Sequence, residues 1–231
     1  MPTDNEHIER VLDGALPPEI LAPQRLHRAM RHATLDGGKR LRARLVYATG
    51  RLFELSMTQL DSAAAAVEMI HAYSLIHDDL PAMDDDALRR GKPTVHIAFD
   101  EATAILAGDG LQAAAFEHIT AIESLSAEQR LEIIRLLSIA VGFNGMVGGQ
   151  ALDLAAEHQA VDVASLRRIH QLKTGALIAA AAETGAICGG ASAPERSQLV
   201  QFAKAIGLAF QVMDDVLDVT GDEPRTGQDG R

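Results

Sequence analysis

An all-helical protein is the fold class that this sequence of 231 residues predicts, and three observations support it. Hydrophobic residues make up 47% of the chain, which excludes a disordered protein. Much of this apolar content is Ala and Leu, whereas aromatic residues are only 3% and Trp is absent, a mix that favours packed helices over sheets. No segment alternates apolar and polar residues with the period of a strand. A chain of this length fits one sizeable domain over residues 1–231, with two small domains as the alternative.

The helical segments are marked by capping residues at their starts and by glycines at their ends. We expect helices at residues 20–35, 39–53, 58–77, 101–122, 131–143, 164–187 and 197–219. Ser126 with Gln129 matches a capping box, and Thr58 can cap the third helix. Residues 81–98 are expected to form a loop. The glycines of residues 145–154 predict an interruption, either a turn or a close approach of the backbone to another segment.

The composition also excludes several classes of function. The formal net charge of −11 argues against non-specific binding to nucleic acid or to an anionic membrane surface. Cys188 is the only cysteine, so we expect neither an intrachain disulfide nor a zinc framework. The polar, acidic residues 1–14 are unlike a secretory signal, and we expect no stretch of about twenty residues to be apolar enough to span a bilayer. The expected location is therefore the cytoplasm.

Five aspartates crowd the stretch that follows the third helix. They are Asp78, Asp79, Asp84, Asp85 and Asp86, and the cations Arg89, Arg90 and Lys92 follow them. Carboxylates this close raise one another's pKa unless a cation lies among them. Carboxylate ligands suit Mg²⁺, which bridges to substrate phosphates, and arginine can bind phosphate oxygens through two hydrogen bonds. The stretch indicates a metal–diphosphate site, with a solvated acidic loop as the alternative.

A second acidic group lies near the end of the last predicted helix. Asp214 and Asp218 are four residues apart and share a helix face, on which Gln211 also lies, and Asp215 adds a third carboxylate. Three carboxylates on an otherwise apolar helix are costly to bury without a cation. The group therefore indicates a second metal site, with an exposed helix end as the alternative.

Polar side chains also mark the helix that leads into the first aspartates. His71, Ser74 and Asp78 follow one another at spacings of three and four, so they lie on one stripe of that helix. The stripe runs into the acidic site, which suggests that His71 and Ser74 face a ligand. A structural histidine is the alternative.

Two further groups of cationic residues complete the candidate site residues. Lys39, Arg40 and Arg42 follow a glycine pair at a helix start, where backbone N–H groups and basic side chains can bind an anion. Lys173 and Thr174 lie in an otherwise apolar helix, and a solvated lysine is the alternative there. Carboxylates, cations and an apolar helical interior together fit a ligand with an anionic head and an apolar tail, bound through a divalent metal.

The sequence resembles the bacterial farnesyl diphosphate synthase group of the short-chain trans-prenyltransferases. The resemblance is carried, in family order, by residues 37–42, 68–94, 104–112, 148–154, 170–177 and 207–222. It implies an isoprenoid-synthase-like helical bundle around a central cavity, a homodimer, and about three Mg²⁺ ions. It also implies head-to-tail condensation of isopentenyl diphosphate with dimethylallyl or geranyl diphosphate. The alternatives are a geranyl or geranylgeranyl diphosphate synthase, or a truncated member that binds prenyl diphosphates without turnover.

The resemblance further implies a role for individual residues. The implied metal site comprises Asp78, Asp79, Asp84, Asp214, Asp215 and Asp218. Arg89 and Lys173 would bind the allylic diphosphate, and Thr174 and Gln211 would lie near the reacting carbons. The diphosphate of isopentenyl diphosphate would be held by Lys39, Arg42, His71 and Arg90. Tyr73 and Ser74 would form the floor that limits product length.

Two departures from the family pattern concern a helix start and the end of the chain. Ala43 stands where the family usually has Pro, which we expect to alter only that helix start. The family chain normally continues past the second aspartate motif with a lysine-bearing loop and further helices. Here residues 226–231 end the sequence, and Gln228 lies near the position of a diphosphate-binding lysine. The domain is therefore interpreted as C-terminally incomplete relative to the family.

Overall fold

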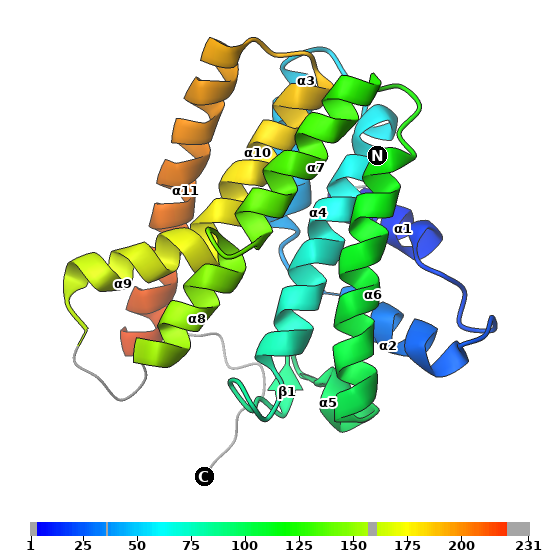
Figure 1. Cartoon of the computed structure of the whole chain (residues 1–231), viewed down its shortest axis with the longest axis vertical. Helices are drawn as coiled ribbons and strands as arrows, with labels where there is room; N and C mark the ends of the chain where they lie inside the picture. The colour runs from blue at the N-terminus through cyan, green and yellow to red at the C-terminus, as the bar shows by residue number, and fades with distance from the viewer. Residues whose placement is uncertain (1–3, 36, 157–160, 221–231) are drawn as a thin grey trace.

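The computed structural model describes residues 4–35, 37–156 and 161–220, with side chains up to residue 209 (Figure 1). Its helices are α1 Asp4–Ala15, α2 Gln24–Thr34, α3 Leu41–Arg51, α4 Met57–Asp78, α5 Val95–Ala98, α6 Glu101–Thr120, α7 Ala127–Val141, α8 Met146–Ala156, α9 Val163–His170, the π-helical turn η1 Gln171–Gly175, α10 Ala176–Cys188 and α11 Ala193–Thr220. In the described part of the chain the sole strands are β1 Leu88–Arg89 and β2 Lys92–Pro93, which pair in an antiparallel manner. The predicted all-helical class is confirmed.

The central helix of the bundle is α4, which packs against α3, α6 and α10 (Figure 1). The four alanines at residues 63–66 are fully buried. A helix that is apolar on every face is stable only when neighbours cover all of it, and these small side chains let several helices approach at once. The last residue of α4 is Asp78, so the packing of the core fixes the position of the first aspartate cluster.

The structure tests the helix caps that were predicted for α7 and α4. At α7 the capping box of Ser126 and Gln129 is confirmed by reciprocal hydrogen bonds of 3.0 and 3.2 Å. At α4 the predicted cap was wrong by two residues, because Ser56 caps the helix in place of Thr58. The backbone N–H and the hydroxyl of Ser56 both donate to Oε1 of Gln59, at 3.0 and 2.9 Å.

Four segments differ from the sequence prediction, and one of them is residues 81–98, a predicted loop that contains β1, β2 and α5. Helix α1 was not predicted, and Ile8 and Leu12 anchor it in the core. The turn predicted for residues 145–154 lies at residues 142–145, and residues 146–154 are helical within α8. The other predicted alternative, a close approach of the backbone to another segment, is found at Gly149, where a side chain would lie 2.3 Å from the backbone nitrogen of Lys173. The predicted helix at 164–187 is divided into α9, η1 and α10 at that same contact.

One described segment, residues 127–156, is by length and composition alone able to cross a membrane, which the sequence analysis did not expect. In the structure this segment forms two helices, α7 and α8, with a non-helical connection between them. About a third of the most apolar part is buried, including Ile133 and Leu137 in the core. The core helices of soluble proteins can have the same length and composition.

Candidate active site

A cavity of about 380 Å³ lies along the C-terminal half of α4, where α3, α8 and η1 face that helix. The residues that line it are Arg42, His71, Tyr73, Ser74, Leu75, His77, Asp78, Met83, Met146, Val147, Gln150, Ala151, Leu154, Lys173 and Thr174. The structure therefore brings predicted site residues from three distant parts of the sequence to one place. The predicted residues Asp79, Arg89 and Arg90 line a smaller hollow between α2, α4 and the paired strands β1 and β2. The side chains of Gln211, Asp214, Asp215 and Asp218 lie outside the described residues.

Asp78 presents a half-buried carboxylate to this cavity from the last turn of α4. Burial raises its pKa to about 6, and the charges of Asp84 and Asp79 add to the rise, against the opposing effect of Lys173 and Arg89. Asp84 lies close because its backbone N–H donates to the carbonyl oxygen of Asp78, at 2.9 Å. The raised pKa means that the surrounding cations do not fully offset the cost of ionising this buried carboxylate. A cation bound beside it would offset that cost.

The neighbouring Asp79 has a different environment. It is almost fully buried, and Nε of Arg89 donates to its Oδ1 at 2.6 Å. Burial raises the pKa of Asp79, while the hydrogen bond and charge of Arg89 oppose the rise. Arg89 also reaches Asp86 at 3.3 Å. Asp79 and Arg89, predicted to serve the metal and the allylic diphosphate, are therefore paired with each other in this structure.

The donor set at this end of α4 fits Mg²⁺ in chemical type. Asp78 and Asp84 carry carboxylate oxygens, the ligands that Mg²⁺ prefers, although Asp84 is exposed and does not line the cavity. Mg²⁺ typically takes only one or two protein carboxylates beside substrate phosphates and water. Among the described residues, no group of three or more His, Cys, Asp or Glu side chains comes together as a metal site. A magnesium site here would use these two carboxylates and oxygens from the substrate.

The cations form a cluster around the N-terminal turn of α3. Arg40 is buried and fully engaged: it donates to Glu9 at 2.7 Å, to Glu68 at 3.2 Å and to the carbonyl of Thr34 at 2.6 Å. Arg42 lines the cavity, and its buried Nε has no hydrogen-bond partner in the described structure. Lys39 is exposed. Arg42 is therefore the member of this group that is available to an anion in the cavity.

Burial and mutual repulsion affect the protonation of this cluster. Burial lowers the pKa of Arg42, and the charge of Arg90 lowers it further, against the opposing charge of Glu68. The pKa of His71 lies well below its ordinary value, chiefly because the ring is buried and then because Arg42 and Arg90 face it. A histidine in this position is neutral at pH 7, so His71 can donate a hydrogen bond to an anion but adds no charge.

The glycine pair before α3 makes room for Arg90. A Cβ on Gly37 would lie 3.0 Å from Cδ of Arg90, and one on Gly38 would lie 2.8 Å from Cζ. Gly38 also has φ +87°, a conformation that favours glycine. The glycines therefore hold the guanidinium of Arg90 against the backbone that leads into α3. The sequence analysis had explained this pair only as the start of an anion site.

Lys173 and Thr174 reach the cavity from η1. Nζ of Lys173 donates to Oδ2 of Asp153 on α8, at 2.7 Å. Burial lowers the pKa of Lys173, but the hydrogen bond to Asp153 and the charges of Asp78 and Asp84 outweigh this effect and raise it. The lysine is therefore charged and faces both carboxylates of the predicted metal site. Asp153, which fixes its position, was not predicted as a site residue.

Tyr73 and Ser74 both line the cavity. Tyr73 is 5% exposed, and its ring contacts the ring of His77 edge-on with 5.7 Å between centroids. His77 is held in turn by the carbonyl of Ile105 on α6, at 3.1 Å from Nε2. The hydroxyl of Ser74 donates to the carbonyl of His71 at 2.8 Å, which turns it toward its own helix. A rigid aromatic wall thus stands at one side of the cavity.

The sequence analysis missed other residues of the cavity wall. His77 lies four residues after Tyr73 on α4, and this helical spacing could have indicated it. Met146 and Gln150 lie on α8, in the stretch that had been interpreted as an interruption. The side-chain amide of Gln150 is buried without a hydrogen-bond partner in the described structure. A polar group in that state can bind a ligand or a water molecule inside the cavity.

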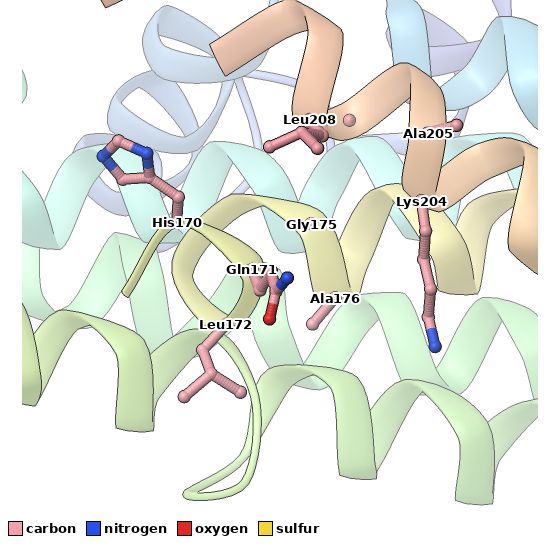
Figure 2. A pocket seen from close by; sticks show the side chains of 9 residues that line it. His170, Gln171, Leu172, Gly175, Ala176, Lys204, Ala205 and Leu208 are labelled. Atoms are coloured by element: carbon pink, nitrogen blue, oxygen red, sulfur yellow. The ribbon is translucent and has the colours of Figure 1, made fainter. Parts of the chain in front are cut away.

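A second cavity, of about 530 Å³, lies on another side of η1, between that turn and α11 (Figure 2). Its wall is formed by His170, Gln171, Leu172, Gly175, Ala176, Lys204, Ala205, Gly207 and Leu208. None of the predicted site residues whose side chains the structure describes lines it, and its described wall contains no carboxylate. The described wall alone does not supply the carboxylates of a metal–diphosphate site, and the side chains of Gln211 and Asp214, further along α11, lie outside the described residues.

The described part of the chain is an all-helical bundle whose central helix ends in carboxylates, near a cluster of cations. The family model described as polyprenyl synthetase matches residues 23–231. The chain belongs to the polyprenyl synthetase family.

Curated relatives and solved structures agree with this family. The farnesyl diphosphate synthase of Haemophilus influenzae is 55% identical over 202 residues, which cover 87% of this chain and 68% of that protein. Geranylgeranyl pyrophosphate synthase 4 of Arabidopsis thaliana is 45% identical over 226 residues, which cover 96% of this chain and 60% of that protein. The apo structure of an FPP/GFPP synthase from Zymomonas mobilis matches with a TM-score of 0.89 at 49% identity, covering 94% of this chain and 79% of the other.

Proposed function

We propose that this protein catalyses the Mg²⁺-dependent head-to-tail condensation of isopentenyl diphosphate with dimethylallyl or geranyl diphosphate, to give farnesyl diphosphate. The observation that carries the proposal is that Asp78, Lys173, Arg42 and His71 line one cavity whose remaining wall is largely apolar. Such a cavity can hold two diphosphates at its polar end and a hydrocarbon chain beside them. The names of the bacterial relatives support this reaction and this product.

The chain's own residues would act by position and charge. Mg²⁺, when bound at Asp78 and Asp84, supplies charge that stabilises the departing diphosphate. Lys173 adds a cation on the same side, and the Thr174 hydroxyl lies beside it at the reacting carbons. Arg42, Arg90 and neutral His71 orient isopentenyl diphosphate so that its C4 faces the allylic carbon.

Two features of this arrangement complete the proposed reaction. The released diphosphate, still held nearby, would take the proton lost in the final elimination. The apolar side chains of the wall exclude water from the allylic cation; they are Leu75, Met83, Met146, Val147, Ala151 and Leu154. Gln211 and the second aspartate group, Asp214, Asp215 and Asp218, are proposed to complete the site from α11.

Two alternative functions remain to be tested. Relatives named as geranylgeranyl pyrophosphate synthases favour a longer product. The second alternative is a member that binds prenyl diphosphates without turnover; the chain spans 68% of the length of the farnesyl diphosphate synthases of Haemophilus influenzae and Escherichia coli. One assay separates all three: purified chain with labelled isopentenyl diphosphate, each allylic diphosphate in turn, and either Mg²⁺ or EDTA. A labelled fifteen-carbon product that requires Mg²⁺ supports the proposal, a twenty-carbon product supports the first alternative, and no product supports the second.

We propose further that residues 1–231 form a single prenyltransferase domain of a cytoplasmic homodimer. Large apolar side chains on α6, on α7 and in the connection after α7 are exposed in the monomer: Leu106 at 57%, Leu131 at 67% and Phe143 at 84%, respectively. Burying such a surface against a second copy is favourable, which supports the dimer. The formal charge of −11 supports the absence of nucleic-acid and stable membrane partners. Light scattering of the purified chain should give twice the monomer mass, and a monomer across the accessible concentration range would contradict the dimer.

The Arg42→Gln variant should raise the KM for isopentenyl diphosphate roughly 10-fold or more, because a hydrogen bond to a charged group contributes about 1.5–3 kcal/mol. The KM for the allylic substrate should change much less. Arg44→Gln is the matched control, because Arg44 is exposed on the same helix and does not line the cavity. Steady-state kinetics with each substrate varied in turn gives the comparison. Equal changes in both KM values would show that the two diphosphate sites are assigned wrongly.

A further inference from the structure

Glu68 is a buried carboxylate at the centre of the cation cluster. The proposed reaction assigns no role to Glu68. It is 2% exposed and lies on α4, three residues before His71, on the same side of the helix. Its two oxygens have different partners. Oε1 accepts the backbone N–H of Ala43 at 3.0 Å, and Oε2 accepts Nη1 of Arg40 at 3.2 Å.

Both partners of Glu68 belong to the segment that presents Arg42 to the cavity. Ala43 lies in the first turn of α3, where backbone N–H groups have no partner within the helix. Arg40 precedes this helix with φ +50°, a conformation that needs support from its surroundings. Arg42 lies between the two contacts. The residues on both sides of Arg42 are therefore held by one side chain of α4, that of Glu68.

We propose that Glu68 is a positioning residue for the diphosphate-binding cations: it anchors the start of α3 to α4 so that Arg42, with Arg90 beside it, faces the cavity. This inference rests on the proposed function, because it concerns the site assigned to isopentenyl diphosphate. It also gives Ala43 a role beyond the helix start predicted from the sequence. A proline at position 43 would have no N–H to donate to Glu68.

The alternative role of Glu68 is to neutralise the arginines without positioning them. The two roles predict opposite results for Glu68→Gln, which keeps the shape of the side chain and removes its charge. Without a negative charge beside the anion site, simple electrostatics predicts tighter binding of a diphosphate. Loss of positioning predicts weaker binding, because the amide holds Arg40 less strongly and Arg42 is no longer fixed.

The test is calorimetric titration of inorganic diphosphate into the full chain in EDTA, so that no metal contributes. We expect about 10-fold weaker binding for Glu68→Gln, by the loss of one charge-assisted contact, and a smaller weakening for Ala43→Pro. Glu183→Gln is the matched control, since Glu183 is a partly buried carboxylate on α10 outside the cavity. Its affinity should equal that of the unmodified chain.

In turnover, Glu68→Gln should raise the KM for isopentenyl diphosphate and leave the KM for the allylic substrate unchanged. General damage to the fold would not produce this difference between the two substrates.

Equal or tighter binding by a folded Glu68→Gln variant would overturn the inference. If circular dichroism shows that Glu68→Gln does not fold, the Ala43→Pro variant provides the test. An unchanged affinity of Ala43→Pro for inorganic diphosphate would also overturn the inference. A native chain that binds no diphosphate in EDTA would also overturn it, because no anion site would exist to be positioned. A native chain that binds diphosphate but forms no product would contradict the proposed function alone.

Discussion

Asp78→Asn should reduce turnover by roughly 100-fold or more, since it removes a proposed metal ligand, and the charge stabilisation by a bound metal is worth several kcal/mol. The same variant should make the metal-free protein more stable above pH 7. Burial raises the pKa of Asp78 from 3.8 to about 6 in the folded protein. The folded state is therefore favoured at low pH, and this stabilisation is lost as the pH rises from about 4 to 6. Asparagine removes the cost of ionising the buried group.

Urea denaturation in EDTA at pH 8 and pH 4 measures this second effect. At pH 8 we expect Asp78→Asn to raise the free energy of unfolding by about 1–2 kcal/mol, discounted for the partial exposure of the side chain, and at pH 4 by almost nothing. Glu117→Gln, an exposed carboxylate on α6, is the control and should change neither stability nor turnover. Near-normal turnover by Asp78→Asn would remove this residue from the metal site.

Tyr73→Ala should shift the product from fifteen carbons toward twenty or more. The ring is almost fully buried, lines the cavity and contacts His77, so we expect the wall to resist the insertion of further methylene groups. Overpacking of this kind costs about 1–3 kcal/mol, enough to stop elongation. Removal of the ring opens the space. Chromatography of the products, with geranyl diphosphate as the starting allylic substrate, gives the distribution directly.

Tyr73→Phe is the matched control for this prediction, because it keeps the ring and removes only the hydroxyl. Its product should remain at fifteen carbons. If a folded Tyr73→Ala variant still makes only that product, Tyr73 packs against α6 and the wall that limits chain length lies elsewhere. Met146 and Val147 on α8 would then be the next candidates, because they line the same cavity.

The helices that place the first aspartate cluster could be predicted from local patterns alone. The alanine-rich run of α4 and its end at Asp78 follow from composition and helix propensity. The π-helical turn η1 could not be predicted, because residues 164–187 have the pattern of one continuous helix. The break coincides with the contact of Gly149 with the backbone of Lys173, which is a tertiary contact between segments more than twenty residues apart.

The pairing of charged side chains in the site also could not be predicted from local sequence patterns. Spacing predicted that Arg89, Arg90 and the aspartates would gather, but not that Arg89 would pair with Asp79. It also did not reveal that Arg40 is occupied by Glu9 and Glu68, whereas Nε of Arg42 has no partner in the described structure. Which cation pairs with which carboxylate depends on helices that meet only in the folded chain. The roles of the individual site residues therefore remain predictions.

The most direct test of the proposed active site is a crystal structure of the chain with Mg²⁺, isopentenyl diphosphate and an unreactive thio-analogue of dimethylallyl diphosphate. We predict Mg²⁺ at about 2.1 Å from carboxylate oxygens of Asp78 and Asp84, bridging to the allylic diphosphate. The diphosphate of isopentenyl diphosphate should contact Arg42 and Arg90, with both hydrocarbon chains directed toward Tyr73. Diphosphates bound instead in the second cavity, between η1 and α11, or Mg²⁺ bound without Asp78, would contradict the proposed site.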